Sequence, residues 1–353
     1  MIGLLEGPLP LHVRFVVSLP HSLLATISLV CASSEFEGLG DWLRETRARL
    51  TADLYEELCV LIGFPGHHQR FIGELSARLP DGAADLEFDE LMAHLCAIPD
   101  VHYQLIALQA LARGTPHSPT PNNLLDLLNR PPEWAAYLAE VESRVAPETV
   151  ATLVRDGAQL KSRLLNALER FWQEAYAQEF KATRPLMEHS VMQHRTVCHN
   201  SDFRQVFTSV TGRLVPEPIS DLLPTITSVT FIPSCYVGPY VAYMHYADQL
   251  LLLYNCRSTP STITAEDGAS LYPPLKALAD ETRLQILTLL QGRELYAQEI
   301  VERLEISQPA VSRHLNLMAA AGVLQIRRKG NAKYYAVNSE TLLHLVDALR
   351  TLV

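Results

Sequence analysis

The chain has 353 residues, of which 48% are hydrophobic and 19% are charged, and it carries a net charge of −10 at pH 7. This composition is typical of a folded globular protein with room for two domains or more, and it excludes a disordered or low-complexity chain. No apolar run reaches the roughly 20 residues of a membrane-spanning helix, and no basic region precedes the apolar residues at the N-terminus. We therefore expect a cytoplasmic protein that has no membrane partner.

The first half of the chain predicts a mostly helical domain that opens with one strand. Residues 11–18 (LHVRFVVS) alternate apolar and polar side chains, as a strand does, and a helix is expected from Pro20 to Val30. Proline and glycine then divide a series of helical patterns. These patterns cover residues 41–62, 69–79, 88–97, 101–112, 134–145 and 147–180.

Three later segments predict strands because they are rich in β-branched and aromatic residues. Their sequences are TSVTFIP at 227–233, YVAYMHY at 240–246 and QLLLLYN at 249–255. Together with residues 11–18 they predict a small antiparallel sheet. Their aromatic side chains either pack in the core or line a pocket for a small-molecule effector. The aromatic residues concerned are Phe231, Tyr236, Tyr240, Tyr243, Tyr246 and Tyr254.

Composition and charge divide the chain into two domains. Residues 257–270 (RSTPSTITAEDGAS) have no periodicity and predict a linker between an N-terminal domain at 1–256 and a C-terminal domain at 271–353. From residue 271 onward there are ten Lys and Arg against eight Asp and Glu, which leaves 19 against 31 before it. The N-terminal domain therefore repels nucleic acid, and contact with DNA is expected from the C-terminal domain.

Residues 295–337 predict a helix-turn-helix. A first helix is expected at 297–304, and a second begins near Gln308, with Ser307 as its capping residue and Pro309 in its first turn. One face of the second helix is apolar and predicts a core contact, whereas the opposite face is polar and open for reading DNA. The apolar stripe consists of Val311, Leu315 and Met318.

A basic β-hairpin, or wing, follows this second helix. Gly322 ends the helix, and strands are expected at 323–328 and 332–338 around a tight turn at Gly330-Asn331. Residues 306–339 contain five Arg or Lys and no Asp or Glu, which is typical of a segment that lies along phosphates. The alternative is a three-helix core with a solvated basic hairpin.

The residues expected to touch double-stranded operator DNA belong to two groups. Arg313 is the best candidate for a bidentate contact with guanine. Base edges are expected to meet Gln308, Ala310, Ser312, Arg313 and Asn316. Phosphates are expected to meet Ser307, Arg327, Arg328, Lys329 and Lys333.

Three motifs carry a resemblance to a known family. They are LKALAD at 275–280, TRLQIL at 282–287 and SQPAVSRHL at 307–315, and they resemble the ArsR-type winged-helix repressors over roughly residues 271–353. The resemblance implies a homodimeric transcription repressor with one recognition helix per subunit in successive major grooves. It also implies a dimer interface made by the segment 272–278 and the last helix, whose apolar stripe is Leu342, Leu345, Val346 and Leu349.

One position departs from the metal-sensing members of that family. Those members carry two cysteines in the first helix of the helix-turn-helix, at the positions that Tyr296 and Gln298 hold here. Neither side chain replaces a thiolate as a ligand of a soft metal, so the family's metal switch is not expected at this site.

The N-terminal domain leaves two alternative functions open. His189, His194, Cys198 and His199 lie within eleven residues and raise the alternative of a metal-responsive regulator, although no recognised zinc spacing is present. The other alternative is an enzyme fused to a DNA-binding module. The sequence has no GxGxxG, phosphate loop, GxSxG or HExxH, so we expect no catalytic residues, no cofactor and no metal. The domain is expected to sense an unknown effector or to support dimerisation, within an α+β, mostly helical protein.

Overall fold

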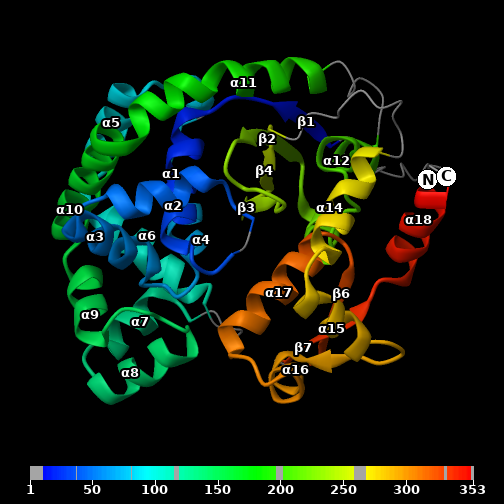
Figure 1. Ribbon diagram of the computed structural model, residues 1–353. Coiled ribbons are helices and arrows are strands. Elements are labelled where there is room, and N and C mark those ends of the chain that lie inside the picture. Colours follow the sequence, from blue (N-terminus) through cyan, green and yellow to red (C-terminus); the bar gives the residue numbers. More distant parts are fainter. Residues whose placement is uncertain are drawn as a thin grey trace, which may run out of the picture.

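The computed structural model describes residues 11–36, 38–80, 82–114, 119–195, 202–257, 268–329 and 332–350 (Figure 1). The chain is mostly helical with two small sheets, which confirms the predicted fold class. The helices of its N-terminal part are α1 (Leu19–Ala32), α2 (Asp41–Arg49), α3 (Ala52–Gly63), α4 (His68–Ser76), α5 (Phe88–Ala97), α6 (Asp100–Ala112), α7 (Pro121–Leu127), α8 (Pro131–Glu140), α9 (Pro147–Arg155), α10 (Gly157–Phe171), α11 (Ala177–Arg195), α12 (Phe203–Thr211) and α13 (Glu217–Ser220). Short 3-10 turns lie at Ala83–Asp85 and Leu223–Thr225.

The long helix that the sequence predicts at 147–180 is interrupted twice. Asp156 leaves the helical conformation, and its side chain accepts a hydrogen bond of 2.8 Å from the Gln159 amide, so that it begins α10 as an N-cap. Gly157 then passes close to α6, because a Cβ there would lie 2.2 Å from the Asp100 carbonyl oxygen. A π-turn at Trp172–Tyr176 separates α10 from α11.

The larger sheet has the strand order β1 (His12–Phe15), β2 (Ser228–Ser234), β4 (Gln249–Asn255) and β3 (Ala242–Tyr246). The strands β1, β2 and β4 are parallel to one another, and β3 pairs with β4 in the antiparallel sense. The prediction of an antiparallel sheet was therefore wrong. The turn between β3 and β4 was identified correctly, but the chain after β2 crosses to the far side of β4 instead of folding back beside β2.

Helices cover both faces of this sheet, which explains the almost continuous apolar run of β4. On one face, Phe15 stacks on Phe231 with 4.8 Å between ring centroids, and His194 of α11 stacks on Phe15 at 5.6 Å. On the other face, α1 and α4 pack over Met244 and Leu253 and leave a cavity of about 20 Å³. Such a cavity has room for little more than one water molecule, so the sheet packs as core.

The C-terminal part forms a winged helix-turn-helix with a core of its own. Its core runs from Ala277 to Tyr335, whereas the buried residues of the N-terminal core end at Cys256. Most of the predicted linker lies outside the described residues. The C-terminal part contains α14 (Gly268–Leu278), α15 (Glu281–Leu289), β5 (Leu295–Tyr296), α16 (Ala297–Leu304), α17 (Gln308–Ala320), β6 (Leu324–Lys329), β7 (Ala332–Val337) and α18 (Ser339–Arg350). Its strands pair in the order β5, β7, β6.

Among the helices of the described ranges, none is alone both long and apolar enough to cross a membrane. By length and composition, α5 and α6 pass that test only as a pair, and the pair bends by 95°.

Candidate nucleic-acid interface

The helix-turn-helix is held in place by its turn and by its apolar stripe. Glu305 adopts a left-handed conformation with φ of 55° and ends α16, so that the chain reverses into α17. Val311, Leu315 and Met318 of α17 are fully buried in the winged-helix core, as their spacing predicts. Ser307 stands at the N-cap position of α17, but its side chain makes no capping hydrogen bond. Ser307 is exposed, and its hydroxyl does not have the capping role that the sequence suggested.

Arg283 fixes the preceding helices of the domain. Its guanidinium is buried, and Nε donates a 2.6 Å hydrogen bond to the Ala277 carbonyl at the C-terminal end of α14. Its amide donates a 3.0 Å hydrogen bond to the N-cap Asp280 of α15. A cation at a helix C-terminus meets the negative end of the helix dipole, so this contact stabilises the angle between α14 and α15.

The reading face of α17 is less open than the sequence predicts. Ser307 and Gln308 at the start of the helix are exposed, whereas the remaining four residues predicted to read bases are only half-exposed. These four are Ala310, Ser312, Arg313 and Asn316. The helix therefore has a cover on part of its polar side.

The cover is the connection between α1 and α2, defined here as residues 33–36 and 38–40 (Figure 1). Leu317 belongs to α17 but not to the winged-helix core, and yet only 7% of it is exposed. A Cβ placed on Gly38 would lie 3.7 Å from Leu317 Cδ1. Leu317, a large apolar residue on the polar face of α17, therefore packs against the N-terminal domain, and it was the sequence signal of this contact.

A cavity of about 460 Å³ lies between the α1–α2 connection and α17. It includes Arg313, the predicted guanine contact, and Arg44 of α2. Its lining consists of Ser33, Ser34, Phe36, Gly38, Leu39, Arg44 and Arg313. The structure thus places the predicted reading residue at a boundary between the two parts of the chain.

The wing is a regular antiparallel hairpin that presents its basic side chains to solvent. Arg327, Arg328 and Lys333 are exposed, and Arg328 lies opposite Lys333 in the register of β6 and β7. Like charges directly opposite one another destabilise a hairpin, and an anion bound beside them relieves this cost. The Lys329 side chain and the predicted turn at Gly330-Asn331 lie outside the described residues.

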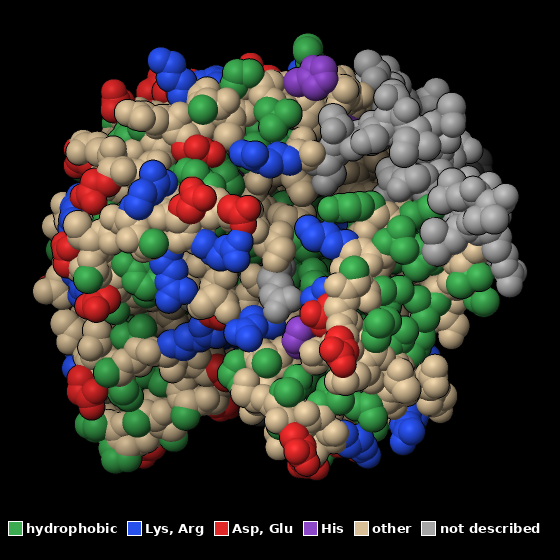
Figure 2. Space-filling view, in the orientation of Figure 1, with side chains coloured by type: hydrophobic (Ala, Val, Ile, Leu, Met, Phe, Trp, Pro, Cys, Tyr) green, Lys and Arg blue, Asp and Glu red, His purple; other side chains and the backbone are tan. Residues whose placement is uncertain are grey.

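An apolar surface lies on the side of the domain where α14 and α18 meet. The two helices pack through Leu271 and Leu345, which are buried. Beside that contact, Tyr272 is 65% exposed and Leu343 is 64% exposed, and Figure 2 shows hydrophobic side chains gathered on this side of the molecule. Val346 of α18 is exposed by 44%, while the Leu349 side chain lies outside the described residues.

Comparison with known proteins agrees with this winged helix. Residues 280–325 match the family model described as bacterial regulatory protein, arsR family. The chain is 43% identical to the transcriptional repressor SdpR of Bacillus subtilis over 67 residues, which are 19% of this chain and 74% of that protein. The chain belongs to the arsR family. It is also 37% identical to the transcriptional activator HlyU of Vibrio cholerae over 78 residues, which are 22% of this chain and 72% of that protein.

The family model lies wholly within the C-terminal domain. A solved structure of HlyU from Vibrio cholerae shares 36% identity and covers 23% of this chain and 88% of its own, with a TM-score of 0.20. The family model and the match to SdpR confirm the resemblance drawn from the three sequence motifs. The two relatives are transcription regulators, and their matches cover 19% and 22% of this chain.

The predicted metal alternative rests on four residues that the structure describes only in part. His189 is exposed, and His194 packs between Phe15 and Tyr254, where burial lowers the pKa of its imidazole. Cys198 and His199 lie outside the described residues. Within the described ranges, no three His, Cys, Asp or Glu side chains are grouped as metal ligands would be.

Proposed function

We propose that this arsR-family protein is a sequence-specific transcription regulator that binds operator DNA in the cytoplasm. The recognition helix α17 would enter the major groove, and the wing would lie on the flanking backbone. The observation that supports the proposal best is that Arg327, Arg328 and Lys333 are exposed and form no ion pair within the described part of the chain. Exposed cations without carboxylate partners are suited to phosphates.

We assign the contacts of the interface by their chemistry. Base edges would be read from α17, with Arg313 on a guanine. The phosphate contacts would come from the exposed Ser307 hydroxyl and from the wing cations, Lys329 included. Gln308, Ala310, Ser312 and Asn316 complete the base-reading set.

The active form is proposed to be a homodimer that pairs through α14 and α18. Tyr272 and Leu343 are each more than 60% exposed on adjoining helices, and exposed apolar side chains that cluster in this way mark an interface. A twofold axis at this surface would bring two copies of α17 to successive major grooves.

The N-terminal domain is proposed to be the regulatory domain, and repression to be the mode of action. In the described arrangement, Leu317 packs on the α1–α2 connection and Arg313 lines the cavity beside it. Neither side chain can occupy that position and a major groove at once, so DNA binding would require the cover to separate from α17. An effector that binds either arrangement better would shift the balance between them.

Two substitutions test the assignment of the interface on the full chain. Arg313→Ala should relax the discrimination between promoter DNA from the protein's own locus and a random duplex of equal length, by about 1–3 kcal/mol. Arg328→Ala should weaken binding to both duplexes alike and reduce the slope of log affinity against log salt by about one. If Arg328→Ala changes base preference, the assignment of the wing to phosphates is wrong.

A further inference from the structure

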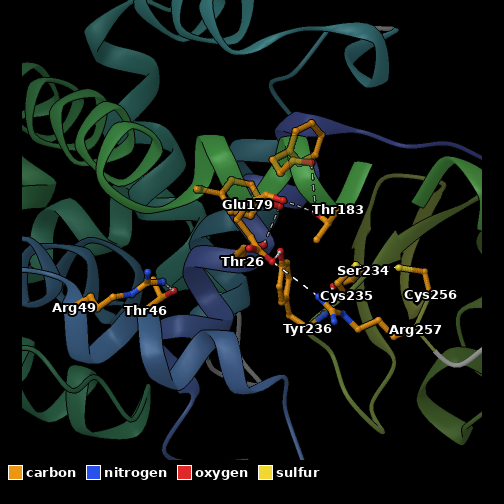
Figure 3. Close-up of polar contacts among 12 residues, drawn as sticks. Thr26, Thr46, Arg49, Glu179, Thr183, Ser234, Cys235, Tyr236, Cys256 and Arg257 are labelled. Atoms are coloured by element: carbon orange, nitrogen blue, oxygen red, sulfur yellow. Dashed lines mark hydrogen bonds and ion pairs between the residues drawn. The ribbon is translucent and has the colours of Figure 1, made fainter. Parts of the chain in front are cut away.

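Two cysteines of the N-terminal domain face each other just beyond the ends of neighbouring parallel strands. Cys235 follows β2 and Cys256 follows β4, and the strands are in register up to Ser234 and Asn255. The Cys256 amide donates a 3.0 Å hydrogen bond to the Ser234 carbonyl, which continues the pairing. The two Sγ atoms lie 3.3 Å apart, and Figure 3 shows the side chains pointing toward each other.

The surroundings of the pair favour ionisation of one of the two thiols. The hydrogen bond between the two thiols and the nearby Arg257 guanidinium lower the pKa of Cys235, and the same hydrogen bond raises the pKa of Cys256. Both residues are buried, but the next residue, Arg257, has a side chain that is 54% exposed. The buried pair therefore adjoins an exposed residue, Arg257. Cys235 would be the nucleophile and Cys256 the second thiol.

A second thiol pair in the same domain provides a comparison. Cys31 of α1 and Cys59 of α3 are hydrogen-bonded, and this bond together with burial raises the pKa of Cys31 well above its usual range. Tyr55 lies next to Cys59, and burial and that thiol raise the pKa of its phenol to about 12. The charge of Arg47 lowers the pKa of Cys31, but the hydrogen bond and burial raise it more, so this second pair serves as an internal comparison.

We propose that Cys235 and Cys256 form a reversible thiol–disulfide site that peroxides oxidise. The Cys235 thiolate attacks one oxygen of hydrogen peroxide, the O–O bond breaks, and the leaving hydroxide takes up a proton to form water. Cys235 is then a sulfenic acid. The Cys256 sulfur attacks it, the S–S bond forms, and the departing hydroxide combines with the Cys256 proton. Two thiols lose two electrons, and one peroxide is reduced to two water molecules.

The site is joined to the recognition helix by a short series of contacts. The Gly40 amide donates a 3.1 Å hydrogen bond to the Tyr236 carbonyl, next to Cys235. Gly238 approaches the same connection so closely that a Cβ there would lie 1.9 Å from the Gly38 carbonyl oxygen. A Cβ on Gly38 would in turn lie 3.7 Å from Leu317 Cδ1 of α17, so the two residues are neighbours. A disulfide draws the two sulfurs to about 2 Å and moves the Cys235 backbone on which this connection rests.

Oxidation therefore loosens the cover on α17 and raises operator affinity. This second step rests on the proposed function, whereas the disulfide itself does not. Allosteric couplings of ordinary size predict an increase in affinity of about fivefold or more.

The first experiment measures the chemistry without DNA. The full chain is reduced, desalted and treated with hydrogen peroxide, and its peptides are mapped by mass spectrometry under non-reducing conditions. We expect one linked peptide pair that contains Cys235 and Cys256, reversed by dithiothreitol. Cys256→Ser should instead accumulate a sulfenic acid at Cys235 that dimedone traps, and Cys59→Ser should leave the disulfide unchanged. If the linkage involves Cys31 and Cys59, or if Cys235 stays unmodified, the proposal is overturned.

The second experiment measures operator binding by the oxidised and reduced full chain, with Cys59→Ser beside the wild type. Far-ultraviolet circular dichroism confirms that the variants of both experiments are folded. If Cys256→Ser is not folded, Cys256→Ala replaces it in the first experiment. A disulfide that forms while operator affinity stays constant overturns the connection to α17. Absence of operator binding in both states refutes the proposed function and leaves the mapped disulfide as an independent result.

Discussion

Replacing Gly38 with Asn should increase operator affinity without touching any residue of the DNA interface. Gly38 has φ of 79°, a left-handed conformation that Asn tolerates better than most residues. Its Cβ would lie 3.1 Å from Pro239 Cδ and 3.7 Å from Leu317 Cδ1, so the rest of the side chain must displace one of these neighbours. The α1–α2 connection should then separate from α17.

The size of the effect follows from the burial of Leu317. Only 7% of this residue is exposed, and full burial of a leucine side chain stabilises by about 1.5–3 kcal/mol. Loss of about 2 kcal/mol from the covered arrangement would raise the apparent operator affinity by up to about 30-fold. Fluorescence anisotropy with a labelled operator duplex, at one fixed salt concentration, measures this change.

Gly82 provides the matched control. It has φ of 83°, and a Cβ there meets nothing within 4 Å, so Gly82→Asn has the same backbone cost without a neighbour to displace. Its operator affinity should equal that of the wild type. If Gly38→Asn binds no more tightly than Gly82→Asn while both remain folded, the contact with Leu317 does not restrict α17, and our account of the N-terminal domain is refuted.

Two further predictions concern stability and assembly. His21 is buried, and burial together with the charge of Arg14 lowers its pKa to about 4, below the 6.5 of an unfolded chain. The free energy of unfolding should therefore be highest above pH 6.5 and fall by about 3 kcal/mol as the pH drops to 4. Urea titrations at several pH values should show that the free energy of unfolding depends less on pH in His21→Gln than in the wild type. An equal dependence on pH in both would contradict the lowered pKa of His21. Leu343→Asp should convert a dimer to a monomer in light scattering, while Leu214→Asp, at a leucine that is 69% exposed on the N-terminal part, should not. A dimer that survives Leu343→Asp places the interface elsewhere.

The C-terminal domain was predictable because its signals are local. The apolar stripe of α17, Pro309 in its first turn and the left-handed Gly322 each act within a few residues, and the helix-turn-helix and the wing strands follow from them within a residue or two. Ser307 shows the limit of such reasoning. The right residue stands at the N-cap position, but its side chain makes no capping hydrogen bond, because residue type alone does not fix which rotamer the side chain adopts.

The N-terminal domain was predicted less well because its organisation depends on distant pairings. Strand β1 pairs with β2 more than 200 residues later, and a pattern of alternating side chains does not tell parallel from antiparallel neighbours. The break at Asp156 was missed because Gly157 is required by an approach to α6 and not by a local turn. The covered face of α17 was also missed, although Leu317 interrupts the polar face, because the pattern does not reveal which distant segment packs there.

The mixed order of the larger sheet has a consequence for biosynthesis. The central strand β2 cannot join β1 and β4 until residue 255 has been made, so the N-terminal domain completes its sheet late in translation. The α1–α2 connection rests on the segment directly after β2, and α17 is synthesised more than 50 residues after β4. At about 5–20 residues per second, several seconds separate the two events. The α1–α2 connection would therefore be folded before α17 leaves the ribosome. Each newly synthesised molecule would then start with α17 covered by this connection.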